Sequence, residues 1–201
     1  MDLPTPMTTV DYLEGQILIA MPTMSDPRFE RSVIYICAHS EEGAMGLVIN
    51  KPAKDINFVE LMSRLNIPAG ADAIEFDLKD HERVVHFGGP VEPGRGFVLH
   101  SGEYNSHENT LAIDENVGLT ATLDVLHEIA AGEGPEKSLL ALGYAGWSPG
   151  QLESEIMQNG WLHCPADEKL LFGTGAADKY KTALDKLGID PALLSNEAGH
   201  A

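Results

Sequence analysis

The stretch from Arg31 to Asn50 constrains the fold of this chain most strongly. It reads RSVIYICAHSEEGAMGLVIN, in which two apolar runs of strand length flank an acidic turn with a glycine. Runs rich in Val and Ile on either side of such a turn are typical of a β-hairpin. Pro52 ends the second run, because proline cannot donate the hydrogen bond of a central strand. The sequence therefore predicts paired strands over 31–39 and 44–50, on which the rest of the chain packs.

Alternation along the first of these strands separates two kinds of side chain. One face is aliphatic and is predicted to point into the core, whereas the other face carries Val33, Tyr35, Cys37 and His39. If the His39 ring leans back, it lowers the pKa of the Cys37 thiol and makes it a nucleophile or a redox-sensing thiol. The alternative is that Cys37 is a small buried hydrophobe. A reactive Cys37 predicts faster alkylation of this residue than of Cys164, and equal, slow labelling would contradict it.

Further elements follow from helical spacing and capping residues. Asn57 and Glu60 have the spacing of a capping box, and Ser148, Pro149 and Gln151 form a second N-terminal signal. The predicted helices cover 57–65, 123–131, 149–159 and 176–187, with a helical turn at 167–172, and the predicted strands besides the hairpin cover 15–21, 84–87, 96–101, 109–113, 117–120 and 137–144.

The order of these elements predicts an α+β fold, because strands and helices do not alternate in a βαβ rhythm. We expect a single compact domain over 15–188, with a mixed or barrel-like sheet built from hairpins and flanked by amphipathic helices. A loose N-terminal arm is predicted over 1–14 and a frayed C-terminal tail over 189–201. Residues 66–83 show an edge strand at most, at 74–78.

Charge limits the partners of this protein. The formal net charge is −18 and the isoelectric point is about 4.6. Phosphate binding requires a local excess of Lys and Arg, so we expect no direct contact with nucleic acid. All five arginines lie at or before Arg95, which places any anion-recognising patch in the first hundred residues. The alternative is that the acidic excess only keeps the protein soluble.

Cysteine content and segment hydropathy indicate the compartment. Cys37 and Cys164 are too few for a disulfide framework, and neither belongs to a CxxC pair. The first fifteen residues lack the basic and apolar regions of a secretory signal, and no apolar run approaches the length of a membrane span. We therefore expect a cytoplasmic protein without a membrane segment.

The segment from His86 to His100 combines four glycines with an arginine. Backbone N–H groups at Gly88 and Gly89 can approach an anion, and Arg95 can hold a carboxylate or phosphate in a bidentate fork. The spacing fits neither GxGxxG nor GxxxxGK[ST]. The alternative is that glycine and proline only shape a connection between two strands.

A second candidate binding position lies at Gly143-Tyr-Ala-Gly-Trp147. This segment ends a predicted strand directly before a helix, where N–H groups and the helix dipole favour ligands. Tyr144 and Trp147 can provide a stacking wall, or they can simply belong to the core. Metal ligation is not predicted, because His163 and Cys164 are adjacent and no other cluster has ligand spacing. We expect no cofactor either.

Three blocks together resemble the bacterial YqgE/AlgH family, which is largely uncharacterised. They are AMPTMSDPRFERSVIYICAHSEEGAMGLVINKP, VVHFGGPVEPGRGFVLH and LLALGYAGWSPGQLESEIMQNGWL, within a match of about 15–172. The resemblance implies a compact α+β domain with a barrel-like sheet. One branch is named for a transcriptional regulator of alginate synthesis, but the chain shows no helix-turn-helix and has the wrong charge for DNA.

Two functional hypotheses remain. The first is a cytoplasmic regulatory or binding module for an unknown small ligand or protein partner, linked to transcription only indirectly, whose site involves Tyr35, Cys37, His39, Gly88, Gly89, Arg95, Tyr144 and Trp147. The second is a thiol-dependent enzyme of unknown reaction that uses Cys37. A depressed thiol pKa in a closed pocket favours the enzyme, and an open groove favours the binding module.

Overall fold

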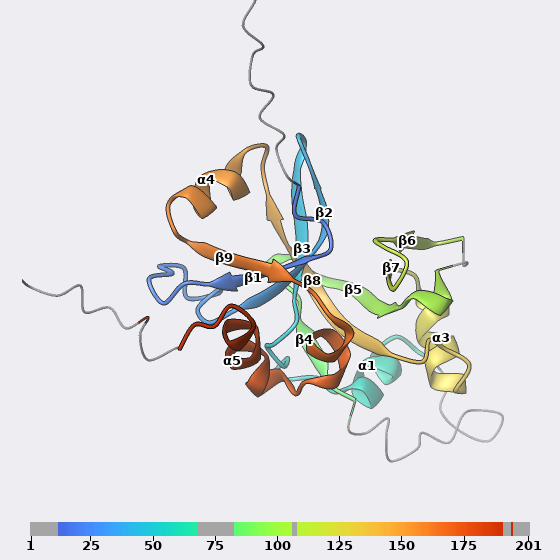
Figure 1. The fold of residues 1–201 in the computed structure, drawn as a ribbon. Coiled ribbons are helices and arrows are strands. Elements are labelled where there is room, and N and C mark those ends of the chain that lie inside the picture. The colour runs from blue at the N-terminus through green and yellow to red at the C-terminus, as the bar shows by residue number, and fades with distance from the viewer. Residues whose placement is uncertain (1–11, 68–82, 106–107, 191–193, 195–201) are drawn as a thin grey trace, which may run out of the picture.

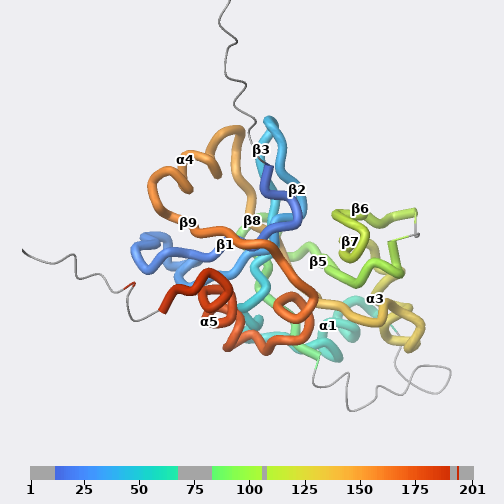
Figure 2. The backbone as a smooth tube through the Cα atoms, in the orientation of Figure 1, coloured from blue at the N-terminus to red at the C-terminus, as the bar shows by residue number. Residues whose placement is uncertain are grey.

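The protein is described by a computed structural model that covers residues 12–67, 83–105, 108–190 and 194. Most of the predicted arm and tail, and the predicted edge strand at 74–78, lie outside these residues. Figure 1 shows a strongly curled sheet with helices on both of its faces, which confirms the predicted α+β class. The backbone trace in Figure 2 follows the same half-barrel curvature.

Nine strands form the described sheet. Their order is β6-β7-β5-β8-β3-β2-β1-β9, and β4 lies beside β8, where it makes the one parallel pairing among these strands. The strands are β1 Gln16–Ala20, β2 Val33–Ser40, β3 Gly43–Val48, β4 Val85–Phe87, β5 Val91–Ser101, β6 Thr110–Ala112, β7 Val117–Thr120, β8 Ser138–Trp147 and β9 Trp161–Pro165.

Helices cover the sheet in three places. The helices are α1 Phe58–Arg64, α3 Leu123–Ala131, α4 Gln151–Met157 and α5 Ala176–Lys186, with a 3-10 turn η1 Gly102–Tyr104 and a π-helical turn η2 Lys169–Gly173. The largest core cluster joins one face of β1, β2, β3, β5 and β8 to α5 and η2. On the opposite face, α4 packs over β1–β3 and the end of β8, and α1 and α3 pack over β4, β5 and the start of β8.

The predicted start is nearly correct for the helix at Asn57 but wrong for the helix that follows Ser148. The Asn57 side chain accepts a hydrogen bond from the Glu60 N–H at 2.9 Å, as the capping box predicted. The helix predicted over 149–159 begins two residues later, because Gly150 is its N-cap, with φ of 73°. One hydrogen bond typical of such an N-terminal signal is present, since the Ser148 N–H donates to the Gln151 side chain at 3.0 Å.

Both faces of β2 are buried, and its aliphatic face points into the core as predicted. Ile34 and Ile36 belong to the cluster beneath α4, whereas Tyr35 and Cys37 belong to the cluster beneath α5. The pairing register of β2 with β3 shifts between Ile36 and Ala38, which marks a β-bulge. A bulge inserts one extra residue and reverses the alternation beyond it. Residues before and after the bulge therefore do not follow a single period of two.

The glycine-rich segment carries the chain across β8. Phe87 of β4 pairs with Leu142 on one edge of β8, and Val91 of β5 pairs with Tyr144 on the other edge. A Cβ at Gly89 would lie 2.1 Å from the carbonyl carbon of Tyr144, which no side chain tolerates. The crossing therefore requires glycine for close backbone contact, as the structural alternative in the sequence predicted.

Candidate functional site

Cys37 lies sealed in the interior of the bent sheet. Its side chain is 1% exposed, and its Sγ contacts the Tyr35 carbonyl oxygen at 3.7 Å. Burial raises the pKa of this thiol far above its ordinary value, and a backbone hydrogen bond from Leu47 opposes the shift only in part. Because a thiolate is the nucleophile in cysteine chemistry, this environment suppresses reactivity. The structure contradicts the predicted lowering of the Cys37 pKa.

His39 lies on the other side of β2 from Cys37. Its Nδ1 accepts a hydrogen bond from the Leu13 N–H at 2.9 Å, so its Nε2 carries the proton and donates to Glu153 at 3.1 Å. Its ring also meets the Tyr12 ring edge-on, with centroids 5.2 Å apart. The bulge after Ile36 explains why the predicted shared face is wrong. His39 ties α4 to β2 and does not activate the thiol.

Tyr35, Gly88 and Gly89 are also buried. Tyr35 is fully buried, and its hydroxyl has no hydrogen-bond partner among the residues that the structure describes. A Cβ at Gly88 would lie 2.2 Å from the Gly143 carbonyl oxygen, so this glycine also packs against β8 backbone. The segment therefore does not present Gly88 and Gly89 as an anion cradle.

A first cavity of about 690 Å³ opens where β5 leaves β8. Its wall includes Met45, Phe97 and Tyr144, and the rings of Phe97 and Tyr144 meet edge-on with centroids 5.8 Å apart. Arg95 lies at its rim on an arch of β5, over the Phe97 ring and 3.4 Å from the Glu92 carboxylate. The cavity thus has an aromatic wall, and its lining also carries polar groups, among them Arg95, which is paired with Glu92.

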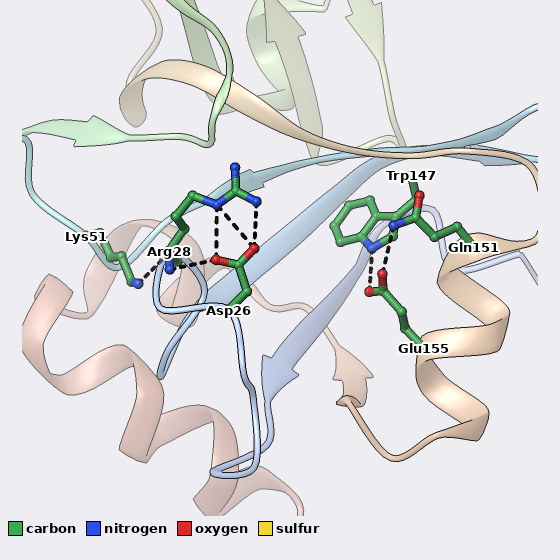
Figure 3. A network of polar contacts seen from close by, with 6 residues as sticks. All are labelled: Asp26, Arg28, Lys51, Trp147, Gln151 and Glu155. Atoms are coloured by element: carbon green, nitrogen blue, oxygen red, sulfur yellow. Dashed lines mark hydrogen bonds and ion pairs between the residues drawn. The ribbon is translucent and has the colours of Figure 1, made fainter.

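A second cavity of about 590 Å³ lies between α4 and the loop that precedes β2. Glu155 organises its α4 side, because one carboxylate oxygen accepts the indole N–H groups of Trp147 and Trp161, at 2.9 and 2.8 Å. The other oxygen accepts the Gln151 amide at 2.8 Å. Figure 3 shows Trp147, Gln151 and Glu155 on this side. These contacts fix both tryptophan rings as a wall of the cavity.

Polar contacts also hold the loop side of the second cavity. Arg28 forms a bidentate ion pair with Asp26, with nitrogen–oxygen distances of 3.0 and 2.7 Å, and these hydrogen bonds lower the pKa of the Asp26 carboxyl. The Lys51 ammonium donates to the Arg28 carbonyl oxygen at 2.7 Å and anchors the loop to the end of β3. Figure 3 shows this group facing the α4 group across the cavity.

The two cavities meet at Val91, Gly146 and Trp147, which line both of them. We call the combined space the Trp147 cleft. Of the predicted site residues, the fold brings Arg95, Tyr144 and Trp147 together there, and it keeps Tyr35, Cys37, His39, Gly88 and Gly89 out of the lining.

The lining also includes residues that the sequence did not single out as site residues, among them Arg28, Phe29, Glu155 and Trp161. The spacing of Gln151 and Glu155, four apart on a helix, was the available signal, since such pairs share one helix face. Nothing local in the sequence shows that the loop before β2 reaches α4.

Among residues 12–67, 83–105, 108–190 and 194, no group of three or more His, Cys, Asp or Glu side chains is placed to hold a metal ion. None of the helices in the described part of the chain is long and apolar enough to cross a membrane.

Comparison with known proteins agrees with the resemblance. A family model described as AlgH-like (DUF179) matches residues 17–192. The chain is 59% identical over 190 residues to a UPF0301 protein of Nitrobacter hamburgensis, which covers 94% of this chain and 88% of the relative. It is 54% identical over 199 residues to a UPF0301 protein of Methylobacterium nodulans, with 99% and 95% coverage.

Solved structures support the same assignment. The solution structure of the AlgH protein from Pseudomonas aeruginosa matches with a TM-score of 0.76 and 43% identity, covering 100% of both chains. A crystal structure of a protein from Corynebacterium diphtheriae shares the fold, with a TM-score of 0.69 and 21% identity over 96% of this chain and 92% of that chain. Since the family model covers most of the sequence and close relatives match nearly all of it, the chain belongs to the AlgH-like family.

Proposed function

We propose that this protein is a binding module whose site is the Trp147 cleft. The observation that carries the proposal is the meeting of two cavities, of about 690 and 590 Å³, at Gly146 and Trp147 of β8. Each is within the usual size range of ligand sites, and each combines aromatic walls with a few fixed polar groups. A small ligand or a segment of a partner protein fits this arrangement.

The thiol-enzyme alternative has lost the observations that favoured it. Burial raises the Cys37 pKa, and the bulge places His39 where it contacts Leu13 and α4 instead. Direct binding of nucleic acid is also disfavoured, because the chain has a formal charge of −18 and the cationic groups at the cleft, Arg28 and Arg95, are already paired with carboxylates.

Tryptophan gives the proposal a direct test. The chain contains two tryptophans, and both line the cleft. A fragment library screened by two-dimensional NMR should give hits that shift the indole N–H signals of Trp147 and Trp161 and change the intrinsic fluorescence. Hits that cluster instead around the separate cavity at Lys51 and Phe87 would contradict the assignment.

A variant and a matched control refine that screen. Tyr144→Ala removes an aromatic wall of the first cavity, so affinity for hits in this cavity should fall about tenfold, as expected for an aromatic contact residue. Leu111→Ala changes a side chain that is 49% exposed on β6, away from the cleft, and should leave affinity unchanged. Equal effects of the two variants would remove Tyr144 from the site.

A further inference from the structure

Among the described strands, none pairs with the edge of β8 that lies beside the cleft. Residues 145–147 pair with β3 on one edge, whereas β5 pairs with β8 only up to Tyr144 on the other edge. The chain before Val91 crosses over β8 and does not continue along it. Within the described part of the chain, no strand therefore occupies the second edge at 145–147. Exposed strand edges are templates for an added strand.

The hairpin register shows which way the backbone groups of β3 point. Ser40 pairs with Gly43 across a two-residue turn, and the pair that closes such a turn is hydrogen-bonded. Because alternate residues direct their N–H and C=O groups to opposite edges, every second residue after Gly43 also points toward β2, and the residues between them point toward β8. The Val48 N–H agrees with this pattern, since it donates to the Gly88 carbonyl oxygen on the β8 side at 2.8 Å.

The same alternation assigns the backbone groups of β8. Ala44 and Gly46 point toward β8 and face Trp147 and Ala145, so these two pairs exchange the hydrogen bonds between β3 and β8. Gly146 lies between them and directs its N–H and C=O groups to the free edge. It is exposed, although Ala145 and Trp147 on either side of it are buried. A glycine within a strand often marks a place where another backbone approaches closely.

The two halves of the cleft lie on opposite faces of the sheet at this edge. Met45 and Tyr144 of the first cavity pack against the cluster beneath α5, and Trp147 and Trp161 of the second belong to the cluster beneath α4. Successive side chains of a strand point to opposite faces, about 3.3 Å apart along the strand. A strand added at Gly146 would therefore place neighbouring side chains in the two cavities.

Charge indicates the kind of segment that fits. In the second cavity Asp26 and Arg28 neutralise each other, which leaves the Glu155 carboxylate as the excess charge of the lining. A Lys or Arg side chain can lay its stem against Trp147 and reach this carboxylate with its charged group. A second copy of this chain suits the edge poorly, because it would bring a further formal charge of −18.

We infer that the Gly146 edge of β8 is the docking site for an extended, basic segment of a partner protein, which adds a strand to the sheet. Its backbone pairs with Gly146, an apolar side chain enters the cavity at Tyr144, and a Lys or Arg enters the cavity at Glu155. This mode is β-augmentation, in which backbone hydrogen bonds give affinity and alternate pockets give specificity. The inference rests on the proposed function of the Trp147 cleft and specifies its partner.

A peptide library provides the probe. Random nine-residue peptides displayed on phage are selected on the immobilised full-length chain, and enriched sequences are synthesised and titrated by fluorescence anisotropy. We expect a Lys or Arg next to an apolar residue, and affinity that weakens as NaCl rises from about 50 to about 500 mM, because exposed charges are screened. Failure to enrich any peptide would overturn the inference.

A backbone scan separates strand addition from other binding. Each peptide is resynthesised with one N-methyl group at successive positions. Methylation of the residue that faces Gly146 should lower affinity about tenfold through the lost hydrogen bond, and its two neighbours should have much weaker effects. A scan without this period of two would overturn the inference.

Two variants at one position complete the test. Gly146→Pro removes the N–H donor from the free edge and should weaken peptide binding about tenfold, whereas Gly146→Ala keeps the donor, and its Cβ lies 3.4 Å from the Tyr144 ring. Thermal unfolding checks that both variants fold. If Gly146→Pro does not fold, the N-methyl scan on the unmodified protein decides the question.

The remaining outcomes distinguish the inference from the proposed function. A dimer in light scattering that Gly146→Pro converts to monomer would assign the edge to a second copy and overturn the inference. Fragments that bind in the Trp147 cleft, together with a flat N-methyl scan, would leave the proposed function standing and refute the strand. Absence of both fragment and peptide binding would refute both.

Discussion

The interior around Cys37 and the cleft at Trp147 lie on neighbouring parts of one sheet, yet they offer opposite environments. In β2 both faces are covered, one by α5 and η2 and the other by α4, so Tyr35 and Cys37 have no access to solvent. In β8 no described strand pairs with the free edge at Gly146, because β5 pairs with β8 only up to Tyr144. Solvent access at Gly146 therefore follows from where β5 stops pairing with β8 and not from the type of residue.

The largest loss of stability is expected from a substitution in the segment that crosses β8. Gly89→Ala should lower the free energy of unfolding by about 4 kcal/mol or more, because its Cβ would lie 2.1 Å from Tyr144 backbone. Gly94→Ala, on the open arch of the same segment, meets nothing within 4 Å and should change it by less than about 0.5 kcal/mol. Urea unfolding measures both, and similar values for the two would refute the crossing.

The stability of the folded protein should also depend on pH through His86. This side chain is buried, and burial lowers its pKa from 6.5 to about 4, although its contact with the Leu140 carbonyl opposes the shift and Lys179 adds to it. Between these pH values the unfolded state binds more protons. His86 therefore contributes stability above about pH 6.5, and up to about 3 kcal/mol of it is lost as pH falls toward 4.

His86→Asn isolates this contribution. Asparagine keeps an N–H donor for the Leu140 carbonyl but does not titrate, so the variant should lose less stability than the parent protein over the same pH range. Thermal unfolding at about pH 7 and about pH 4.5 supplies the comparison. Parallel losses in the two proteins would show that His86 does not carry the acid sensitivity.

Thiol labelling tests whether the interior is closed. Cys37 should react with iodoacetamide on the order of 100-fold more slowly in the folded protein than in denaturant, because burial excludes the reagent and raises the thiol pKa. Cys164 is also buried and its pKa is also raised, so it should label slowly too. Cys37 should therefore have no advantage in rate over Cys164. Mass spectrometry after trypsin digestion resolves the sites. Rapid labelling of Cys37 would restore the reactive-thiol hypothesis.

The smallest expected effect concerns the cleft wall. Glu155→Ala leaves two indole N–H groups without their acceptor and should lower the free energy of unfolding by about 1 to 2 kcal/mol, with altered tryptophan fluorescence. Gln158→Ala removes an exposed side chain from the same cavity and should stay within about 0.5 kcal/mol. No difference between the variants would mean that Glu155 does not fix the rings.

Sequence patterns located most elements because their signals are local. The hairpin, the Asn57 cap and the strand at 117–120 all depend on residues within a few positions of one another. The N-terminal signal at Ser148 was also local, but Gly150 took the cap position in the folded chain. Its φ of 73° is a backbone state that glycine adopts readily and other residues rarely adopt.

Site residues were harder to predict, since whether each one lines a cavity depends on residues that are distant in the sequence. Tyr144 and Trp147 were identified from the strand end before a helix, and both line the cleft. Cys37 and His39 were grouped by a period of two, which a single extra residue in β2 reverses. No pattern in the sequence indicates such a bulge, because it reflects the pairing of β2 with β3.

By itself, the sequence determined the α+β class, the central hairpin, the Asn57 cap and the family, because each is encoded in short-range spacing or in blocks of similar residues. Only the tertiary structure decided which groups meet solvent. Cys37 is closed off by α5, whose residues lie far along the chain, and Gly146 is exposed because the chain crosses β8 at Gly89. Local alternation indicates which face of a strand is apolar, but whether a given residue meets solvent depends on packing between remote segments.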